Sequence, residues 1–169
     1  MTTFLILVFS LFSLGTPSGE TTQEAMTTYY FIRHAEKDTS DPQDKDPKLT
    51  EIGLERAKKW AEVFKEVEFD LIYSSDFNRT RTTAKIIAES KEKEVDIYDP
   101  RKLNDAEFQK RSKGKKVLVV GHSNTNPHFV NLILEENRYK DIDEAESGSL
   151  FIVHVFPNGA KASEVLYIN

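Results

Sequence analysis

Two short apolar runs, each followed at once by polar residues that include a histidine, most constrain how this chain folds. Tyr29–Ile32 leads into Arg33 and His34, and Val117–Val120 leads through a glycine into His122. Four consecutive apolar residues are typical of a strand that is buried on both faces, as in a parallel sheet. Because ligands bind beyond the carboxyl ends of strands in open α/β sheets, we expect both histidines at one site.

Strand-like and helical patterns alternate along the rest of the chain. Thr50 is a suitable N-cap for one amphipathic helix, and a second helix is expected over residues 77–89. Further strands are expected at residues 69–73, 95–98, 149–156 and 164–168. One more helix is expected to end at about residue 137. Pro157–Gly159 is a hairpin signal between the last two strands. This order predicts an α/β fold, a three-layer α/β/α sandwich with a mostly parallel central sheet and a C-terminal hairpin.

Composition restricts the class of protein. The 169 residues are enough for one domain with a proper core, which we expect over residues 28–169. The formal net charge of −5 and the lack of a Lys/Arg stripe argue against nucleic acid as a partner. The chain has no cysteine, which excludes disulfides, thiolate nucleophiles and cysteine-based zinc sites.

The first 27 residues differ from the rest. Phe4–Leu14 is apolar except for two serines, and no charged side chain precedes Glu20. This run is too short to span a bilayer but suits the apolar region of a signal peptide. We therefore expect residues 1–27 to be a signal peptide and linker, with export to the periplasm or the extracellular space and no stable membrane anchor. If Met26 is the true start instead, the protein is cytoplasmic.

The polar residues at the predicted strand ends suit phosphate. They include the two histidines and Arg33. Two further arginines, Arg79 and Arg81, follow the serine pair at the end of the second strand. A guanidinium group can bind two phosphate oxygens at once, and it keeps its positive charge at any working pH. Imidazole can attack phosphorus and form a covalent intermediate. Arg79 and Arg81 point apart on a helix, so we expect Arg81 at the surface.

Four segments, in this order along the chain, resemble the motifs of the histidine phosphatase (phosphoglycerate mutase-like) superfamily, especially its compact phosphohistidine phosphatases. Phe31–Lys37 (FIRHAEK) is similar to the Arg-His-Gly/Ala signature, and Leu49–Ala57 (LTEIGLERA) is similar to the Leu-Thr-x-x-Gly-x-x-x-Ala segment. Ser75–Ala84 (SDFNRTRTTA) resembles the Ser-x-x-x-Arg-x-x-x-Thr-Ala segment, and Val119–Asn124 (VVGHSN) resembles the second-histidine motif.

The resemblance implies a role for each matching residue. His34 would be the nucleophile and form a phosphohistidine, which water then hydrolyses. Arg33, Arg79 and His122 would surround the phosphoryl group, with His122 cationic once phosphate is bound. Ser123 would either donate to the phosphate or shape the turn. The resemblance implies no cofactor and no metal, and the substrate would be a small phosphorylated molecule or a phosphoprotein.

The proton donor is harder to assign. Protonation of a leaving alcohol needs a nearby carboxylic acid. Many relatives supply it from a Leu-x-Glu segment, and the nearest match here is Leu103–Asp105, with Asp in place of Glu. Asp105 is therefore the expected acid or, alternatively, a helix N-cap, and Glu107 and Glu36 are the other candidates. Without a positioned acid, the substrate should carry a good leaving group, such as a phosphoramidate or an aryl phosphate.

Three other functions stay open. The resemblance implies that a mutase of the same superfamily uses a longer insertion than is present here, where His122 follows Arg79 by 43 positions. A non-catalytic module would bind phospholigands without turnover. A metal hydrolase would use the aspartates of residues 38–46, but Arg33 beside His34 disfavours a divalent cation and the glycine and closing glutamate of a calcium loop are missing. Specificity would reside in the loops at residues 36–48, 99–116 and 137–148. The sequence carries no signal for oligomeric state.

Overall fold

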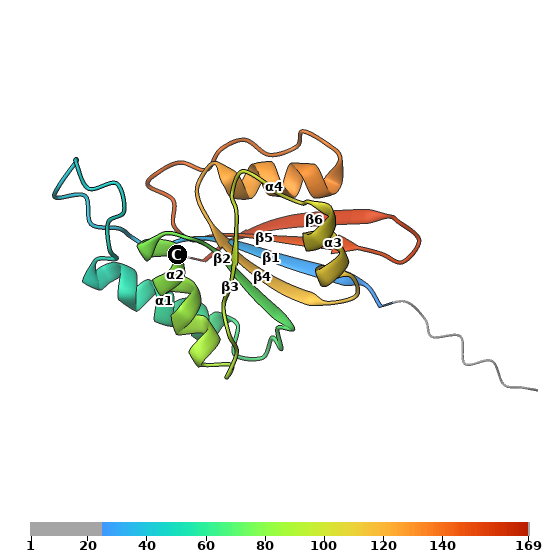
Figure 1. Ribbon diagram of the computed structural model, residues 1–169, viewed down its shortest axis with the longest axis horizontal. Helices are drawn as coiled ribbons and strands as arrows, with labels where there is room; N and C mark the ends of the chain where they lie inside the picture. Colours follow the sequence, from blue (N-terminus) through green and yellow to red (C-terminus); the bar gives the residue numbers. More distant parts are fainter. Residues whose placement is uncertain (1–24, 169) are drawn as a thin grey trace, which may run out of the picture.

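The structure, a computed structural model, describes residues 25–168. This part of the chain forms one six-stranded sheet with two helices on each face (Figure 1). The arrangement confirms the three-layer α/β/α sandwich that the sequence predicts. The predicted signal peptide lies outside the described residues, so it stays a prediction.

The sheet is parallel over four strands and antiparallel at one edge, in the order β3-β2-β4-β1-β5-β6. The parallel strands are β1 (Thr27–Arg33), β2 (Leu71–Ser75), β3 (Asp96–Tyr98) and β4 (Lys116–Gly121). The C-terminal hairpin consists of β5 (Ser149–Val155) and β6 (Lys161–Tyr167). The helices are α1 (Glu51–Val63), α2 (Asn78–Glu89), α3 (Ala106–Ser112) and α4 (Thr125–Leu134). All four parallel strands therefore end at the same edge of the sheet.

Strand β4 shows why a continuous apolar run was needed. Successive side chains of a strand point to opposite faces, so a strand between two helix layers must be apolar on both. Val117 and Val119 pack in the core beneath α3 and α4, whereas Leu118 and Val120 pack in the core beneath α1 and α2. All four side chains are fully buried. Trp60 of α1 is buried in the same core as Leu118 and Val120 and therefore serves packing.

Local signals set where several elements begin and end. The Thr50 side chain accepts a hydrogen bond from the backbone N–H of Gly53 at 3.0 Å and caps α1, as predicted. The β5–β6 hairpin turns at Gly159, whose φ of 82° suits glycine. Helix α4 ends before the predicted residue 137, because Glu135 adopts a left-handed conformation with φ 58°. Strand β2 lies two positions later than predicted, and β6 begins at Lys161 rather than residue 164.

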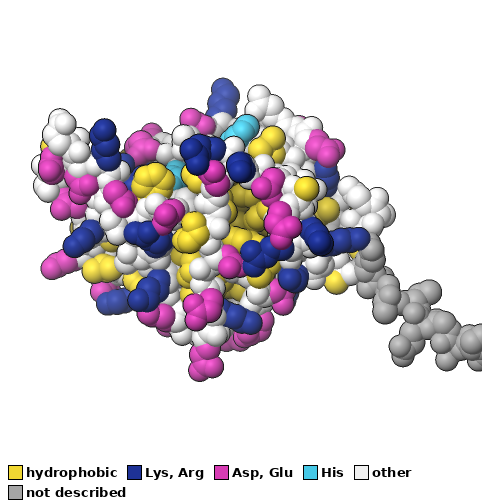
Figure 2. Space-filling view, viewed as in Figure 1, with side chains coloured by type: hydrophobic (Ala, Val, Ile, Leu, Met, Phe, Trp, Pro, Cys, Tyr) yellow, Lys and Arg dark blue, Asp and Glu magenta, His cyan; other side chains and the backbone are white. Residues whose placement is uncertain are grey.

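The surface carries mixed charge on the face seen in Figure 2, where acidic and basic side chains are interspersed and apolar side chains show near the middle. Among the described residues, no helix combines the length and the apolar character needed to cross a membrane.

Candidate active site

The ends of β1 and β4 place His34 and His122 side by side. Arg33 is the register partner of Gly121, and the backbone N–H of His34 donates to the Gly121 carbonyl at 2.9 Å. The two imidazole centroids lie 5.4 Å apart, and the rings meet edge to face at 68°. The structure thus brings together the two histidines that the sequence assigns to one site.

His34 is held in one tautomer by its neighbour in the chain. Its Nδ1 lies 2.8 Å from the carbonyl oxygen of Ala35, and because a carbonyl only accepts, Nδ1 carries the proton. The ring is buried, with 3% of the residue exposed. Burial, together with the charges of Arg33, His122 and Arg79, lowers the pKa of His34 to about 3. At neutral pH the imidazole is therefore uncharged, and its Nε2 has a free lone pair.

His122 is oriented by the serine that ends β2. Its Nε2 lies 2.8 Å from the Ser75 hydroxyl, which also donates to Thr80 Oγ1 at 3.0 Å. The edge of Phe77 packs against the ring, with centroids 5.1 Å apart. Burial, followed by the charges of Arg79 and Lys37, lowers the pKa of His122 to about 4. His122 is thus neutral in the free protein, and the expected cation would form only when an anion binds.

Arg79 enters the site from the first turn of α2. Its guanidinium stacks on the Phe77 ring at 4.5 Å, and Asp46 lies 3.7 Å from Nη1. Asp46 is itself fixed by Asn78, whose backbone N–H donates to its carboxylate at 2.7 Å. Nε and Nη1 of Arg79 are buried and have no hydrogen-bond partner within residues 25–168. Buried donors without acceptors are costly, so this side chain is prepared to bind an anion.

Arg33 is more fully engaged than Arg79. Its Nη1 donates to the carbonyl oxygens of Asp143, Glu144 and Glu146 at 3.2, 2.8 and 3.0 Å. Its Nη2 forms a 2.7 Å ion pair with the Glu144 carboxylate. Only its buried Nε lacks a partner in the described part of the chain. Arg33 therefore anchors the loop that precedes β5 as well as carrying charge into the site.

A pocket of about 640 Å³ lies between these side chains. His34, Arg79, His122 and Ser123 line it, whereas Arg33 approaches it through Glu144. The Ser123 hydroxyl donates to the other oxygen of Glu144, and Lys37 Nζ lies 4.0 Å from this carboxylate. The pocket thus combines a neutral imidazole, whose Nε2 has a free lone pair, with several cationic groups, which suits transfer of a phosphoryl group.

Comparison with protein families agrees with this chemistry. Residues 29–110, which include Arg33, His34 and Arg79, match the family model of the histidine phosphatase superfamily (branch 1). Over this segment the chain is similar to the histidine phosphatase superfamily. No curated protein matches it at a significant level.

Several solved structures share the fold of this chain. Phosphoserine phosphatase from Entamoeba histolytica in complex with 3-phosphoglyceric acid is 18% identical, with a TM-score of 0.63 over 85% of this chain and 98% of that chain. The protein histidine phosphatase SixA complexed with tungstate is 17% identical, with a TM-score of 0.64 over 83% and 96%. Mycobacterial glucosyl-3-phosphoglycerate phosphatase is 13% identical, with a TM-score of 0.61 over 85% and 99%. At these identities the likeness shows the fold.

The acids proposed from the histidine phosphatase motifs lie elsewhere. Asp105 caps α3 and accepts a hydrogen bond from the Phe108 N–H at 2.8 Å, which is the alternative role given above. Asp105 and Glu107 line a separate hollow. Glu36 pairs with Arg56 at 2.5 Å. The carboxylates among the described lining residues of the 640 Å³ pocket are instead Asp141 and Glu144.

Arg81, His128 and His154 lie outside the lining of this pocket, and Arg81 is at the surface as expected. Arg81 is exposed on α2 and pairs with Asp76. His128 is exposed on α4, and His154 on β5 contacts Thr28 at 3.2 Å. Within residues 25–168, no group of three or more His, Cys, Asp or Glu side chains is placed to hold a metal ion.

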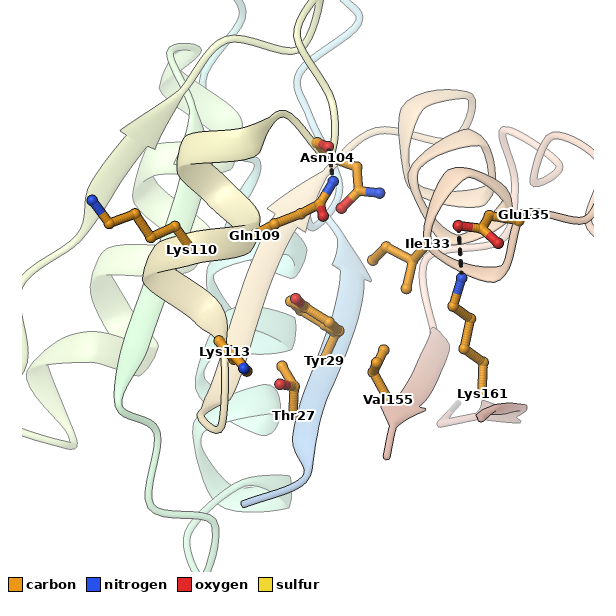
Figure 3. Close-up of a pocket in the computed structure, with 10 residues that line it drawn as sticks. All are labelled: Thr27, Tyr29, Asn104, Gln109, Lys110, Lys113, Ile133, Glu135, Val155 and Lys161. Atoms are coloured by element: carbon orange, nitrogen blue, oxygen red, sulfur yellow. Dashed lines mark hydrogen bonds and ion pairs between the residues drawn. The ribbon is translucent and has the colours of Figure 1, made fainter. Parts of the chain in front are cut away.

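A second hollow of about 370 Å³ lies at the opposite edge of the sheet (Figure 3). It is bordered by Thr27 at the start of β1 and by Lys161 at the start of β6, and Lys161 reaches to Glu135 at 3.0 Å. The described side chains that line it include no histidine and no arginine. The groups needed for phosphoryl transfer are therefore gathered at the carboxyl edge of the sheet.

Proposed function

We propose that this protein is a phosphatase that hydrolyses a phosphomonoester or phosphoramidate through a phosphohistidine on His34. The observation that carries the proposal is the state of His34, which is buried and neutral with Nδ1–H bound to Ala35. This leaves Nε2 as the nucleophile, in the same pocket as Arg79, whose buried Nε and Nη1 have no hydrogen-bond acceptor in the described part of the chain. A nucleophile beside preorganised donors is the arrangement that phosphoryl transfer requires.

The reaction would have two halves. In the first, His34 Nε2 attacks phosphorus and the leaving group departs, while Arg79 and His122 stabilise charge on the phosphoryl oxygens. A bound phosphate dianion favours protonation of His122, which then becomes a second donor. In the second half, water attacks phosphorus and restores neutral His34. Because guanidinium groups supply the positive charge, we propose that neither half needs a metal ion.

The substrate would be a small phosphorylated molecule or a phosphoprotein. Support comes from the neighbours in fold, which were solved with phosphoserine, 3-phosphoglyceric acid or tungstate. The pocket of about 640 Å³ offers room for such a ligand. A mutase is the closer rival of this assignment, because it would use the same phosphohistidine.

One assay distinguishes the proposed phosphatase from a metal hydrolase and from a binding module. Release of phosphate from p-nitrophenyl phosphate, an alkyl phosphate and phosphohistidine would be measured with and without EDTA. We expect turnover that resists EDTA, is lost in His34→Ala and persists in the control His128→Ala. Acid-labile phosphate should be trapped on His34. Activity that survives His34→Ala would refute the mechanism, EDTA-sensitive activity would favour a metal hydrolase, and binding without turnover would favour a binding module.

We also propose that the protein is exported, on the basis of the apolar segment Phe4–Leu14. Expression of the full chain followed by N-terminal sequencing of the mature protein tests this. Cleavage between this segment and β1 is expected. An uncleaved chain retained in the cytoplasm would contradict export.

A further inference from the structure

The Glu144 carboxylate occupies an unusual place for an acidic side chain. One oxygen pairs with Arg33 Nη2 at 2.7 Å, and the other accepts from the Ser123 hydroxyl. Lys37 Nζ lies 4.0 Å away. These are groups that a substrate phosphate would use, so Glu144 lies where the reacting ester must bind.

The geometry allows this side chain to move without its backbone. Arg33 Nη1 holds the carbonyls of residues 143, 144 and 146, and the Ile142 N–H donates to the Ser123 carbonyl at 2.8 Å. The Glu144 side chain itself is 66% exposed. An incoming phosphate can therefore displace the carboxylate from Arg33 and Ser123 while the loop keeps it at the mouth of the pocket.

An ester of an ordinary alcohol needs a proton donor at that position. The departing alkoxide is a strong base, and a positioned carboxylic acid accelerates its departure. Asp105, Glu107 and Glu36 lie outside the pocket, which leaves Asp141 and Glu144 among the described lining residues. Among these residues, no hydrogen bond or ion pair joins Asp141 to Arg33, Ser123 or His122, whereas Glu144 contacts two of them.

We propose that Glu144 is the proton donor to the leaving group, a role that rests on the phosphatase function proposed above. As the bond between His34 Nε2 and phosphorus forms, the bond from phosphorus to the leaving oxygen breaks and its electron pair stays on that oxygen. The carboxyl proton of Glu144 passes to the same oxygen. In the second half, the Glu144 carboxylate takes a proton from the attacking water, the N–P bond breaks, and phosphate departs.

Electrostatics explain how this acid would become protonated only with substrate present. In the free protein, the hydrogen bond from Ser123, followed by the charges of Arg33, Lys37 and Arg79, lowers the pKa of Glu144. A phosphate dianion would take over these same partners and add a like charge beside the carboxylate. Two anionic groups that share one site raise the pKa of one of them, so the displaced Glu144 would bind a proton.

The dependence on the leaving group tests this role. Values of kcat/KM would be measured for an alkyl phosphate and for p-nitrophenyl phosphate, whose phenolate departs without protonation. For Glu144→Gln we expect a loss of about 100-fold on the alkyl phosphate and little change on the aryl phosphate. Glu144→Asp, which keeps the acid, should recover part of the loss. Asp141→Asn removes the same charge from the same pocket and should keep the wild-type ratio.

Two results would overturn the assignment. Equal losses of Glu144→Gln on both esters would show that Glu144 acts only as a competing anion. If Asp141→Asn also lost activity mainly on the alkyl phosphate, the loss would reflect removal of negative charge from the pocket and not proton donation by Glu144. Trapping of acid-labile phosphate with p-nitrophenyl phosphate separates a failure of the proton-donor role from a failure of the phosphatase mechanism. If wild type forms no phosphohistidine, the phosphatase mechanism fails; if it forms in both wild type and Glu144→Gln, only the leaving-group comparison decides the donor.

Discussion

His34 and His122 share one desolvated site, with their ring centroids 5.4 Å apart and the rings arranged edge to face. Protonation of either ring in the free protein would bury a positive charge and place it near the charges of Arg79 and Arg33. The pKa values of about 3 and about 4 express this cost. The same environment that keeps His34 nucleophilic should therefore affect how the fold responds to acid.

We predict that stability falls as the pH drops from about 6.5 toward 4. Both pKa values are lower in the folded protein than the ordinary 6.5, so the unfolded chain binds more protons in this window and protonation favours unfolding. Each histidine contributes a slope of up to about 1.4 kcal/mol per pH unit. Urea unfolding of wild type and His34→Asn at pH 7 and pH 5 measures this. The loss between the two pH values should be about 2 kcal/mol smaller in the variant.

The matched control for this titration is His128→Asn, because His128 is exposed on α4. It should lose as much stability between pH 7 and pH 5 as wild type does. An equal loss in wild type and His34→Asn would mean that His34 does not stay neutral in the fold.

The two arginines of α2 should behave differently. Arg79 has buried N–H groups that find no hydrogen-bond acceptor among residues 25–168, whereas Arg81 is exposed and paired with Asp76. Removal of one preorganised donor from an anion site typically costs about 100-fold or more in rate, or about 3 kcal/mol. We expect Arg79→Ala to lower kcat/KM for p-nitrophenyl phosphate by this factor and Arg81→Ala to change it less than about threefold. Similar losses in both variants would contradict the assignment.

Much of the fold could be predicted from the sequence, because several elements are set by residues close together in the chain. Val117–Val120 predicted a strand buried on both faces, and Thr50 predicted the start of α1, because strand burial and helix caps depend on local sequence. Strand ends then indicated where His34 and His122 would meet. The end of α4 was predicted too late, since nothing local shows that Glu135 adopts a left-handed backbone.

The contacts of Glu144 could not be read from the sequence. They join Glu144 to Arg33 across 111 positions and to Ser123 across 21 positions. The loop at residues 137–148 carries no motif, so only the fold reveals which of its acids enters the pocket. For the same reason, the carbonyl partners of Arg33 were not anticipated, and Asp105 was favoured for its resemblance to the Leu-x-Glu segment although it caps α3.

Ser75 should act as a positioning residue for His122. Its hydroxyl lies 2.8 Å from Nε2 and is fully buried, so Ser75→Ala removes the group that fixes the ring. Hydrogen bonds to charged groups contribute about 1.5 to 3 kcal/mol, and we expect kcat/KM to fall about tenfold or more. Ser74→Ala is the control, because the Ser74 hydroxyl is equally buried but donates to the Ser75 carbonyl at 2.8 Å. Ser74→Ala should lower the free energy of unfolding and leave kcat/KM unchanged. If both variants lose activity equally, packing rather than orientation of His122 explains the effect.

Gly53 links the start of α1 to the loop that holds His34. A Cβ at this position would lie 2.2 Å from the carbonyl oxygen of Glu36, which also accepts from the Thr50 N–H at 2.9 Å. Glu36 directly follows Ala35, whose carbonyl fixes the Nδ1 proton of His34. Gly53→Ala must therefore move either α1 or this loop. We expect a loss of about 1 to 3 kcal/mol in the free energy of unfolding and a lower kcat at temperatures where the variant stays folded. Glu62→Ala, a change at an exposed position of the same helix, should alter neither the stability nor kcat. A Gly53→Ala protein with wild-type stability and activity would show that α1 does not support the loop that holds His34.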